Sequence, residues 1–269
     1  MLFRSSSAAV RTHDKAHILK HLSKDLEFKD VTDDIICLGI FGPKSRDLLS
    51  KITEEDITNE NFKFGTSKNI KLNSTDVWTQ RLSYVGELGY ELYIPTKDAK
   101  EIYNLIINTG KQFRLSNCGA HAMDTMRMES GFLHWGHDIS PEENQYQAGL
   151  NFAISYKKPF DFIGKEKLLK IRDQKLDRRF VMLVLKDNTP GKPLLLHEEP
   201  IYLDDKIIGK TTSGNYSFNY NKNLSFGYVN SELSNEKLID KNICIEIEKK
   251  KYPAELLEKP LKHNNFKNI

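Results

Sequence analysis

The sequence predicts an α+β domain followed by a small all-β barrel. Up to about residue 172, helical patterns alternate with strand patterns, as in Ile35 to Phe41 and Asp98 to Thr109. From Arg179 onward the helical pattern disappears, and short β-rich runs take its place. Mixed helices and strands of the first kind are typical of α+β folds, and series of short strands are typical of barrels or sandwiches. We therefore expect two domains, over residues 1–172 and 173–269.

The first domain is expected to contain an early strand followed by several helices. The apolar run Ile35 to Phe41 predicts a strand, and it ends in Gly42-Pro43, a pair that favours a turn before a helix. Lys44 to Ile52 and Asp98 to Thr109 then place apolar residues at the spacing of amphipathic helices, and Gly110 closes the second one. A third helix is expected from Lys165 to about Arg172.

The run Arg81 to Tyr93, RLSYVGELGYELY, alternates apolar and polar residues with a period of two. This pattern predicts a strand through Leu82 to Ile94. Gly86 and Gly89 bracket Glu87, and glycines within a strand mark a bulge or a close approach of another group to the backbone. Two interpretations of Glu87 stay open. It is either a solvated carboxylate at a twisted bulge or a carboxylate placed to accept parallel N–H donors of a ligand.

The run Ala122 to Ser140, AMDTMRMESGFLHWGHDIS, begins as a helix and stops at Gly131, because glycine is a favoured C-terminal cap. Arg127 and Glu129 lie two positions apart, so they point to different faces of this helix. Arg127 is expected either in a structural ion pair or beside a carboxylate or carbonyl group of a ligand. No chemistry is assigned to His137 and Asp138, since a histidine beside a glycine turn is more often a hydrogen-bonded structural residue.

Five β-rich runs form the expected barrel: Phe180 to Leu185, Pro200 to Leu203, Lys206 to Thr212, Ser225 to Tyr228 and Ile243 to Ile247. Turn residues separate them, at Asn188 to Gly191, Asp204-Asp205 and Ser213-Gly214-Asn215. Thr212-Ser213-Gly214 lacks the long glycine spacing of a phosphate loop, so a tight turn is expected there. The charged cluster Glu248 to Lys251 is interpreted as a solvated strand end.

Composition argues against several function classes. The 40 basic and 37 acidic residues give a net charge of +3 without a concentrated basic stripe, so nucleic-acid binding is not expected. No apolar stretch reaches the roughly 20 residues that span a bilayer, and no membrane partner is expected. The three separated cysteines supply neither a disulfide framework nor a paired metal motif, which favours a reducing compartment.

The two runs RLSYVGELGYELY and AMDTMRMESGFLHWGHDIS together resemble the folate-binding core of the aminomethyltransferase family. That family includes the T-protein of the glycine cleavage system and the C-terminal halves of dimethylglycine and sarcosine dehydrogenases. Further segments resemble its C-terminal barrel: Gly209 to Gly214, Phe226 to Val229 and Pro253 to Leu256. The resemblance implies a partial folate-binding domain over residues 1–172 and a T-protein C-terminal barrel over residues 173–269. The motifs HWGHD and RTHD favour the dehydrogenase branch.

This resemblance implies a ligand and its contacts. Tetrahydrofolate is the implied ligand, and Glu87 is the implied acceptor for the N–H donors of its pterin. Arg127 inherits a position near the folate, with Tyr84 and Tyr90 as packing partners. Met123 stands where relatives often carry Arg, which removes a charge from that side of the expected pocket. In the family, a one-carbon unit passes to tetrahydrofolate from an oxidised N-methyl amine such as dimethylglycine or sarcosine, or from an aminomethyl carrier.

The resemblance covers about the last two thirds of a complete transferase, so an N-terminally truncated form is expected. No residue matches the family's catalytic aspartate, and none is assigned a catalytic role; weak or absent catalysis by this chain alone is expected. Three descriptions stay open: a folate-binding transferase module, a non-catalytic folate-binding or regulatory subunit, and a gene fragment without independent activity. The expected partner, besides folate, is a separate polypeptide that carries FAD or the N-terminal lobe. No flavin is expected on this chain itself, which lacks a dinucleotide fingerprint.

The N-terminal segment contains two further patterns. Met1 to Arg11 has Arg and Ser and lacks acids, as transit peptides do, but it continues directly into family-like sequence and is interpreted as mature chain. The expected location is the cytoplasm, or the mitochondrial matrix in a eukaryote. His13, His17 and His21 have helical spacing without a zinc-type carboxylate motif, so no metal site is expected.

Overall fold

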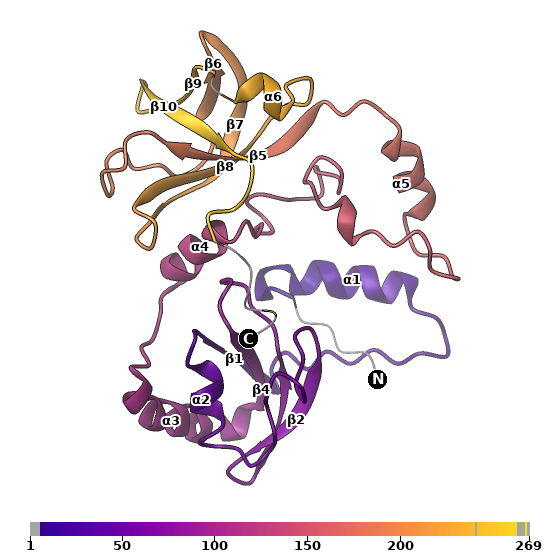
Figure 1. Cartoon of the computed structure of the whole chain (residues 1–269). Helices are drawn as coiled ribbons and strands as arrows, with labels where there is room; N and C mark the ends of the chain where they lie inside the picture. The colour runs from indigo at the N-terminus through magenta and orange to yellow at the C-terminus, as the bar shows by residue number, and fades with distance from the viewer. Residues whose placement is uncertain (1–5, 240, 263–266, 268–269) are drawn as a thin grey trace. The chain divides into compact units, whose positions relative to one another are not determined.

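The computed structural model describes residues 6–239, 241–262 and 267 (Figure 1). The chain divides into two compact units that alternate along the sequence. The first unit comprises Met1–Ile40, Ser45–Arg81 and Tyr90–Leu115, and the second comprises Phe41–Lys44, Leu82–Gly89 and Ser116–Ile269. The domain border expected after residue 172 stays a prediction.

The first unit is built on a four-stranded sheet with strand order β1-β4-β3-β2. Strands β2 and β3 form an antiparallel hairpin, and β3 pairs antiparallel with β4. The strands are β1 (Ile35–Phe41), β2 (Ser67–Leu72), β3 (Thr75–Gln80) and β4 (Gly89–Pro95). The helices are α1 (Arg11–His21), α2 (Ser45–Leu49) and α3 (Ala99–Gly110), with short 3₁₀ turns at Ala8–Val10, Thr96–Asp98 and Lys111–Phe113.

Burial in this unit follows the sequence pattern. Strand β1 has the predicted bounds, and α3 begins and ends within a residue of the prediction. On α3, Ile102 and Ile106 are four positions apart and both buried, because residues at this spacing lie on one face of a helix. Ile70 and Leu72 of β2 and Leu92 of β4 are fully buried as well. The alternation of apolar residues thus gives the sheet one face that packs into the core of the unit.

The strand predicted through Leu82 to Ile94 is wrong over its first half. Strand β4 begins only at Gly89, and Leu82 and Ser83 lie outside any strand before the series of bends from Tyr84 to Leu88. The backbone of Gly86 has a φ of +65°, a left-handed conformation that interrupts an extended strand. The close approach predicted from the two glycines is nevertheless present. A Cβ atom at Gly89 would collide with the ring of Phe41, and one at Gly86 with Ser130.

The second unit contains the helix α4 (Ala120–Glu129), which ends as predicted before Gly131. The N–H of Phe132 donates to the carbonyl of Arg127 at 2.9 Å, and the N–H of Gly131 donates to that of Met128 at 3.0 Å. With the φ of +75° at Gly131, these two bonds make a Schellman motif. The unit's other helices are the 3₁₀ turn Asn151–Ala153, α5 (Lys165–Arg172) and α6 (Asn235–Leu238). Helix α5 has the predicted bounds.

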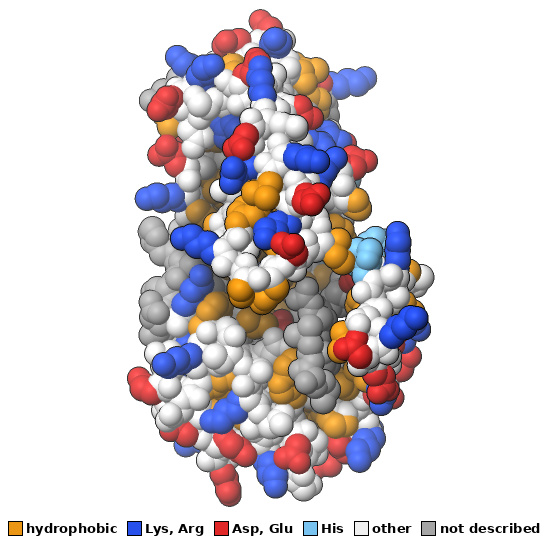
Figure 2. Space-filling model, turned by 90° about the vertical axis from the view of Figure 1, so that its right-hand side faces the viewer, with side chains coloured by type: hydrophobic (Ala, Val, Ile, Leu, Met, Phe, Trp, Pro, Cys, Tyr) orange, Lys and Arg blue, Asp and Glu red, His pale blue; other side chains and the backbone are white. Residues whose placement is uncertain are grey.

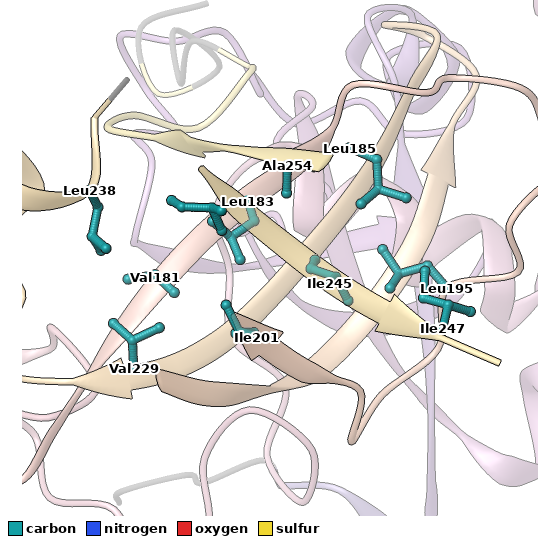
Figure 3. Close-up of a cluster of buried hydrophobic side chains, with 11 residues drawn as sticks. Val181, Leu183, Leu185, Leu195, Ile201, Val229, Leu238, Ile245, Ile247 and Ala254 are labelled. Atoms are coloured by element: carbon teal, nitrogen blue, oxygen red, sulfur yellow. The ribbon is translucent and has the colours of Figure 1, made fainter. Parts of the chain in front are cut away.

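The C-terminal part of the second unit is a closed antiparallel barrel with strand order β10-β5-β8-β7-β6-β9, which confirms the predicted all-β barrel (Figure 1). Its strands are β5 (Arg178–Leu185), β6 (Pro200–Leu203), β7 (Lys206–Ser217), β8 (Lys222–Asn230), β9 (Ile243–Ile247) and β10 (Lys250–Leu257). Figure 3 shows the apolar cluster inside it, to which Val181, Ile201 and Ile245 contribute from three strands. Alternate residues of each strand point inward, as small closed barrels require.

One turn prediction for the barrel is wrong. The turn predicted at Ser213-Gly214-Asn215 lies inside strand β7, which pairs with β8 through these residues after a register shift between Thr211 and Ser213. The charged cluster Glu248 to Lys251 is exposed and follows β9, in agreement with the interpretation as a solvated strand end. Glu248 and Lys249 form a hairpin turn with positive φ, and strand β10 begins at Lys250. The sequence pattern did not predict β10, because it contains Lys250, Lys251 and Pro253, and lysine and proline are depleted in strands.

Among the described residues, no helix is long and apolar enough to cross a membrane. Within the same residues, no group of His, Cys, Asp and Glu side chains has an arrangement that could hold a metal ion. His13, His17 and His21 lie on α1, which has no buried residue. On the face shown in Figure 2, basic and acidic side chains are interspersed rather than grouped by sign.

Candidate functional site

Glu87 lies in the loop before β4, and its side chain is 28% exposed. One carboxylate oxygen, Oε1, forms an ion pair with the ammonium of Lys262. The backbone N–H of Glu87 donates to the hydroxyl of Ser83 at 3.1 Å, which fixes the loop on the other side. Among the described residues, no donor contacts the second oxygen, Oε2. The carboxylate is therefore held in place and keeps acceptor capacity for a further group.

Gly86 allows this arrangement because it has no side chain. A Cβ atom there would run into the Ser130 side chain and would lie 3.2 Å from the Cδ atom of Lys262. Its φ of +65° also lies in the region that other residues adopt only with strain. The loop, the end of α4 and the aliphatic part of Lys262 thus meet where Glu87 begins.

Tyr84 lies three residues before Glu87 in the same loop. Its hydroxyl donates to the carbonyl of Leu133 at 3.2 Å, and its ring stacks on Phe132 with 6.4 Å between centroids. Burial raises the pKa of the Tyr84 hydroxyl, an effect that the charge of Arg127 partly opposes. The phenol is therefore neutral at physiological pH and acts as a hydrogen-bond donor.

Tyr90 belongs to the first compact unit, whereas Tyr84, Glu87 and Arg127 belong to the second. It is fully buried, and its hydroxyl accepts a hydrogen bond from Arg46 Nε at 3.1 Å. Its ring lies 5.7 Å from that of Phe62. Burial raises the pKa of this hydroxyl too. Within its unit, Tyr90 is a core residue with a satisfied polar end.

Arg127 is buried, with 1% of its side chain exposed, and it is surrounded by acceptors. Its Nε donates to Asp124 at 2.7 Å, its Nη1 to the carbonyl of Phe132 at 3.0 Å and to Asp138, and its Nη2 to Ser213 at 2.7 Å. The guanidinium also lies 5.3 Å from the centre of the Phe226 ring. These contacts are those of the structural ion pair that the sequence left open as one role for Arg127.

Asp138 is the centre of this network, although the sequence assigned it no chemistry. Its Oδ2 accepts from Arg127 and from the N–H of His134 at 2.9 Å, and its Oδ1 accepts from Thr212 at 2.6 Å and Ser213 at 2.8 Å. A fully buried carboxylate with four donors is well satisfied. No local signal marks this role, because Thr212 and Ser213 lie more than seventy positions away in the sequence.

Glu129 is a second buried acid of this unit, and it lies close to the Glu87 loop. Its carboxylate accepts from Ser217 at 2.6 Å and from Asn219 at 2.9 Å, and its backbone carbonyl accepts from the N–H of Lys262 at 2.8 Å. Tyr220 lies near both acids: burial, then the charges of Glu129 and Glu87, raise the pKa of its hydroxyl. The loop between β7 and β8 therefore reaches the same place, which sequence reasoning missed.

A cavity of about 410 Å³ lies elsewhere in the second unit. Its lining includes Lys167 and Lys170 of α5, together with Asn144, Gln147 and Asp177. None of the four predicted site residues lines it. Its lysines lie on a largely exposed helix, so we interpret it as a solvated surface depression.

Family models match most of the chain. The GCVT N-terminal domain matches residues 2–158, and the glycine cleavage T-protein C-terminal barrel domain matches residues 178–262. The crystal structure of glycine cleavage system aminomethyltransferase T from Bartonella henselae superposes with a TM-score of 0.79. The superposition covers 95% of this chain and 67% of that chain at 20% sequence identity, and it supports the same fold.

Similar curated proteins include dimethylglycine dehydrogenase, mitochondrial, of Homo sapiens, which is 37% identical over 237 residues. The matched region covers 88% of this chain and 27% of that protein. Sarcosine dehydrogenase, mitochondrial, of Mus musculus is 33% identical, over 82% of this chain and 24% of that protein. An aminomethyltransferase of Thermoanaerobacter pseudethanolicus is 32% identical, over 90% of this chain and 64% of that protein. The chain thus spans about a quarter of the dehydrogenases, and it belongs to the GCVT family of glycine cleavage T-proteins.

Proposed function

We propose that this chain binds a reduced folate, tetrahydrofolate, through its pterin, and that it serves one-carbon transfer to that folate. The one-carbon unit would come from an oxidised N-methyl amine, such as dimethylglycine or sarcosine, or from an aminomethyl carrier. Membership of the family and similarity to proteins named dimethylglycine dehydrogenase, sarcosine dehydrogenase and aminomethyltransferase support this proposal.

The observation that carries the proposal is the state of the Glu87 carboxylate. It is partly exposed, held by the loop, and its Oε2 accepts no hydrogen bond from the described residues. A pterin presents the N3–H and the 2-amino group as two parallel donors, and a carboxylate accepts such a pair in bidentate fashion. Oε1 has two lone pairs, so it can keep its contact with Lys262 while it accepts from the pterin.

The other three predicted residues have supporting roles in this proposal. Tyr84 belongs to the same loop as Glu87, and its ring, which stacks on Phe132, would offer an apolar surface to the pterin. Arg127 has most of its donors occupied, so its contribution is to fix Asp138 and the end of α4 that adjoins Gly86. Tyr90 anchors the first residues of β4, the strand that follows the Glu87 loop.

The proposal extends to location and partners. The mammalian dehydrogenases named above are mitochondrial, so we propose the mitochondrial matrix if the organism is a eukaryote and the cytoplasm otherwise. A polypeptide that carries FAD is the proposed source of the oxidised amine. In this division of labour, this chain binds and orients the folate, so that the reacting nitrogen of the folate meets the one-carbon unit.

Isothermal titration of the 269-residue chain with 5-formyl-tetrahydrofolate, a stable reduced folate, tests the proposal. Glu87→Gln should weaken binding by about tenfold to a hundredfold, since a hydrogen bond to a charged group contributes about 1.5–3 kcal/mol. Glu142→Gln is the matched control, because Glu142 is an exposed acid of the same unit, and it should bind like the unchanged chain. Equal affinities of the Glu87 variant and the control would contradict the proposed contact between Glu87 and the pterin. Binding without any transfer in an assay supplied with the oxidised amine would favour the non-catalytic subunit instead.

A further inference from the structure

Lys262 is fixed beside Glu87 by more than its charge. Its side chain is only 13% exposed, and its ammonium pairs with Glu87 Oε1. Its backbone N–H donates to the carbonyl of Glu129 at 2.8 Å, and its Cδ atom packs over Gly86. Most surface lysines are held by none of these contacts, and their ammonium groups move freely. These contacts therefore fix the ammonium of Lys262 in one position beside Glu87.

The ammonium keeps donor capacity in this position. Lysine carries three N–H donors, and among residues 6–239, 241–262 and 267 the ammonium of Lys262 donates to Glu87 Oε1 alone. The neighbouring acid, Glu129, takes its hydrogen bonds from Ser217 and Asn219 and none from this ammonium. Two carboxylate acceptors and one donor thus follow one another: Oε2 of Glu87, Oε1 of Glu87 and Nζ of Lys262.

We infer that Lys262 reads the 4-oxo group of the pterin, an inference that rests on the proposed folate binding at Glu87. Along one edge, a 2-amino-4-oxo-pteridine presents two donors and one acceptor in a row: the 2-amino group, N3–H and the oxygen at position 4. The row of Glu87 and Lys262 presents two acceptors and one donor, which is the complement of that edge. Glu87 supplies binding to the amidine part, and Lys262 makes the site specific for an oxygen at position 4.

The site would also discriminate against a ligand that has an amino group at position 4. A pteridine with an amino group at position 4 has lost the hydrogen on N3 and places N–H donors toward the ammonium. Donors would then face donors, and the Glu87 oxygen would face a ring nitrogen without its hydrogen. A mismatch of this kind discriminates by leaving polar groups unpaired. Lys262 is thus a specificity-determining residue, and it takes no part in the bond-making step.

The test compares two ligands that differ only at position 4: 5-formyl-tetrahydrofolate and its 4-amino-4-deoxy counterpart. The unchanged chain should prefer the 4-oxo ligand by about tenfold or more, the scale that one unpaired polar group produces. Lys262→Met keeps the aliphatic part over Gly86 and the backbone bond to Glu129, and it should weaken only the 4-oxo ligand, so that the preference falls to within about threefold. Lys262→Arg keeps a donor and should retain most of the preference.

Lys259→Met is the matched control, because Lys259 is an exposed lysine of the same segment, and its preference should equal that of the unchanged chain. Thermal unfolding of each variant verifies that the fold is retained. An unchanged preference in Lys262→Met would overturn the inference, but it would not contradict the proposed binding of the pterin by Glu87. Tighter binding of the 4-oxo ligand by that variant would also overturn it, because the ammonium would then be a competitor for Glu87. If the unchanged chain binds neither ligand, the proposed function itself fails, and the inference falls with it.

Discussion

Two ion pairs of the second unit join a cation to a carboxylate in different surroundings. Arg127 and Asp138 are 1% and 0% exposed, and each has several further partners. Lys262 and Glu87 are 13% and 28% exposed, and each side chain has the other as its partner among the described residues. The first pair is closed to any added molecule, whereas the second leaves donors and acceptors unused. A buried, fully satisfied pair supports the fold, and a partly open pair is the better candidate for a ligand.

The largest expected effect tests this difference by removing each cation in turn. Arg127→Met leaves the buried Asp138 carboxylate without its cation and should lower the free energy of unfolding by about 3–5 kcal/mol. Lys262→Met removes a partly exposed pair and should cost about 1 kcal/mol or less. Urea unfolding followed by circular dichroism measures both variants. Similar losses for the two variants would show that the pairs are equivalent and would weaken the contrast between them.

Gly86→Ala should have an intermediate effect on stability. The added Cβ would collide with the Ser130 side chain, and the φ of +65° strains any residue other than glycine, so a loss of about 1–3 kcal/mol is expected. Gly149→Ala is the matched control, because Gly149 has a similar φ of +69° and nothing within 4 Å of its added Cβ. The difference between the two urea midpoints isolates the collision. If Gly149→Ala is the more damaging change, the packing of Ser130 against the loop is loose.

The smallest expected effect concerns pH at the edge of the Arg127 network. Burial first, and then the charges of His137 and Arg127, lower the pKa of His134, while Asp124 and Asp138 oppose the shift. The folded chain therefore binds this proton less readily than the unfolded chain, whose histidine has a pKa of about 6.5. Stability is unaffected above that pH and is lost as the pH falls from 6.5 through the lowered value. The side chain is 44% exposed, so solvent screens the effect.

Urea midpoints at pH 7.5 and pH 5.5 measure this dependence in the unchanged chain and in His134→Gln. The unchanged chain should lose more stability over the interval than the variant, because only it can take up the proton. Parallel losses would mean that His134 is equally easy to protonate in both states.

The sequence predicted the fold well where local pattern decides it. Strands β1, β6 and β9 and helix α5 have the predicted bounds, because apolar spacing and flanking turn residues agree there. Strand β10 was missed, since Pro253 and three nearby lysines oppose a strand until β5 and β9 supply partners on both sides. The tight turn predicted at Ser213 was wrong for the converse reason. Its turn-like residues are held in a strand by pairing with β8 and by the hydrogen bond to Asp138.

The candidate site was predictable only at one of its ends. The glycines around Glu87 indicated a close approach at that acid, and the structure shows one, through Ser130 and Lys262. Nothing local marked Lys262, Glu129 or Tyr220, because their proximity to the loop depends on how the barrel and α4 pack. The roles assigned to Glu87, Arg127, Tyr84 and Tyr90 toward folate stay predictions. Contacts across long sequence separations carry no periodic signal, so a single sequence cannot reveal them.

The separation of Glu87 and Lys262 along the chain has a consequence for biosynthesis. The two residues lie 175 positions apart. A ribosome that adds about 5 to 20 residues per second needs roughly 10 to 35 s to travel that distance. During this interval the nascent acid has no lysine beside it, and the barrel strand that delivers the lysine is still unsynthesised. Any ligand selectivity that Lys262 confers can therefore arise only after the closing strand β10 has been synthesised and has docked.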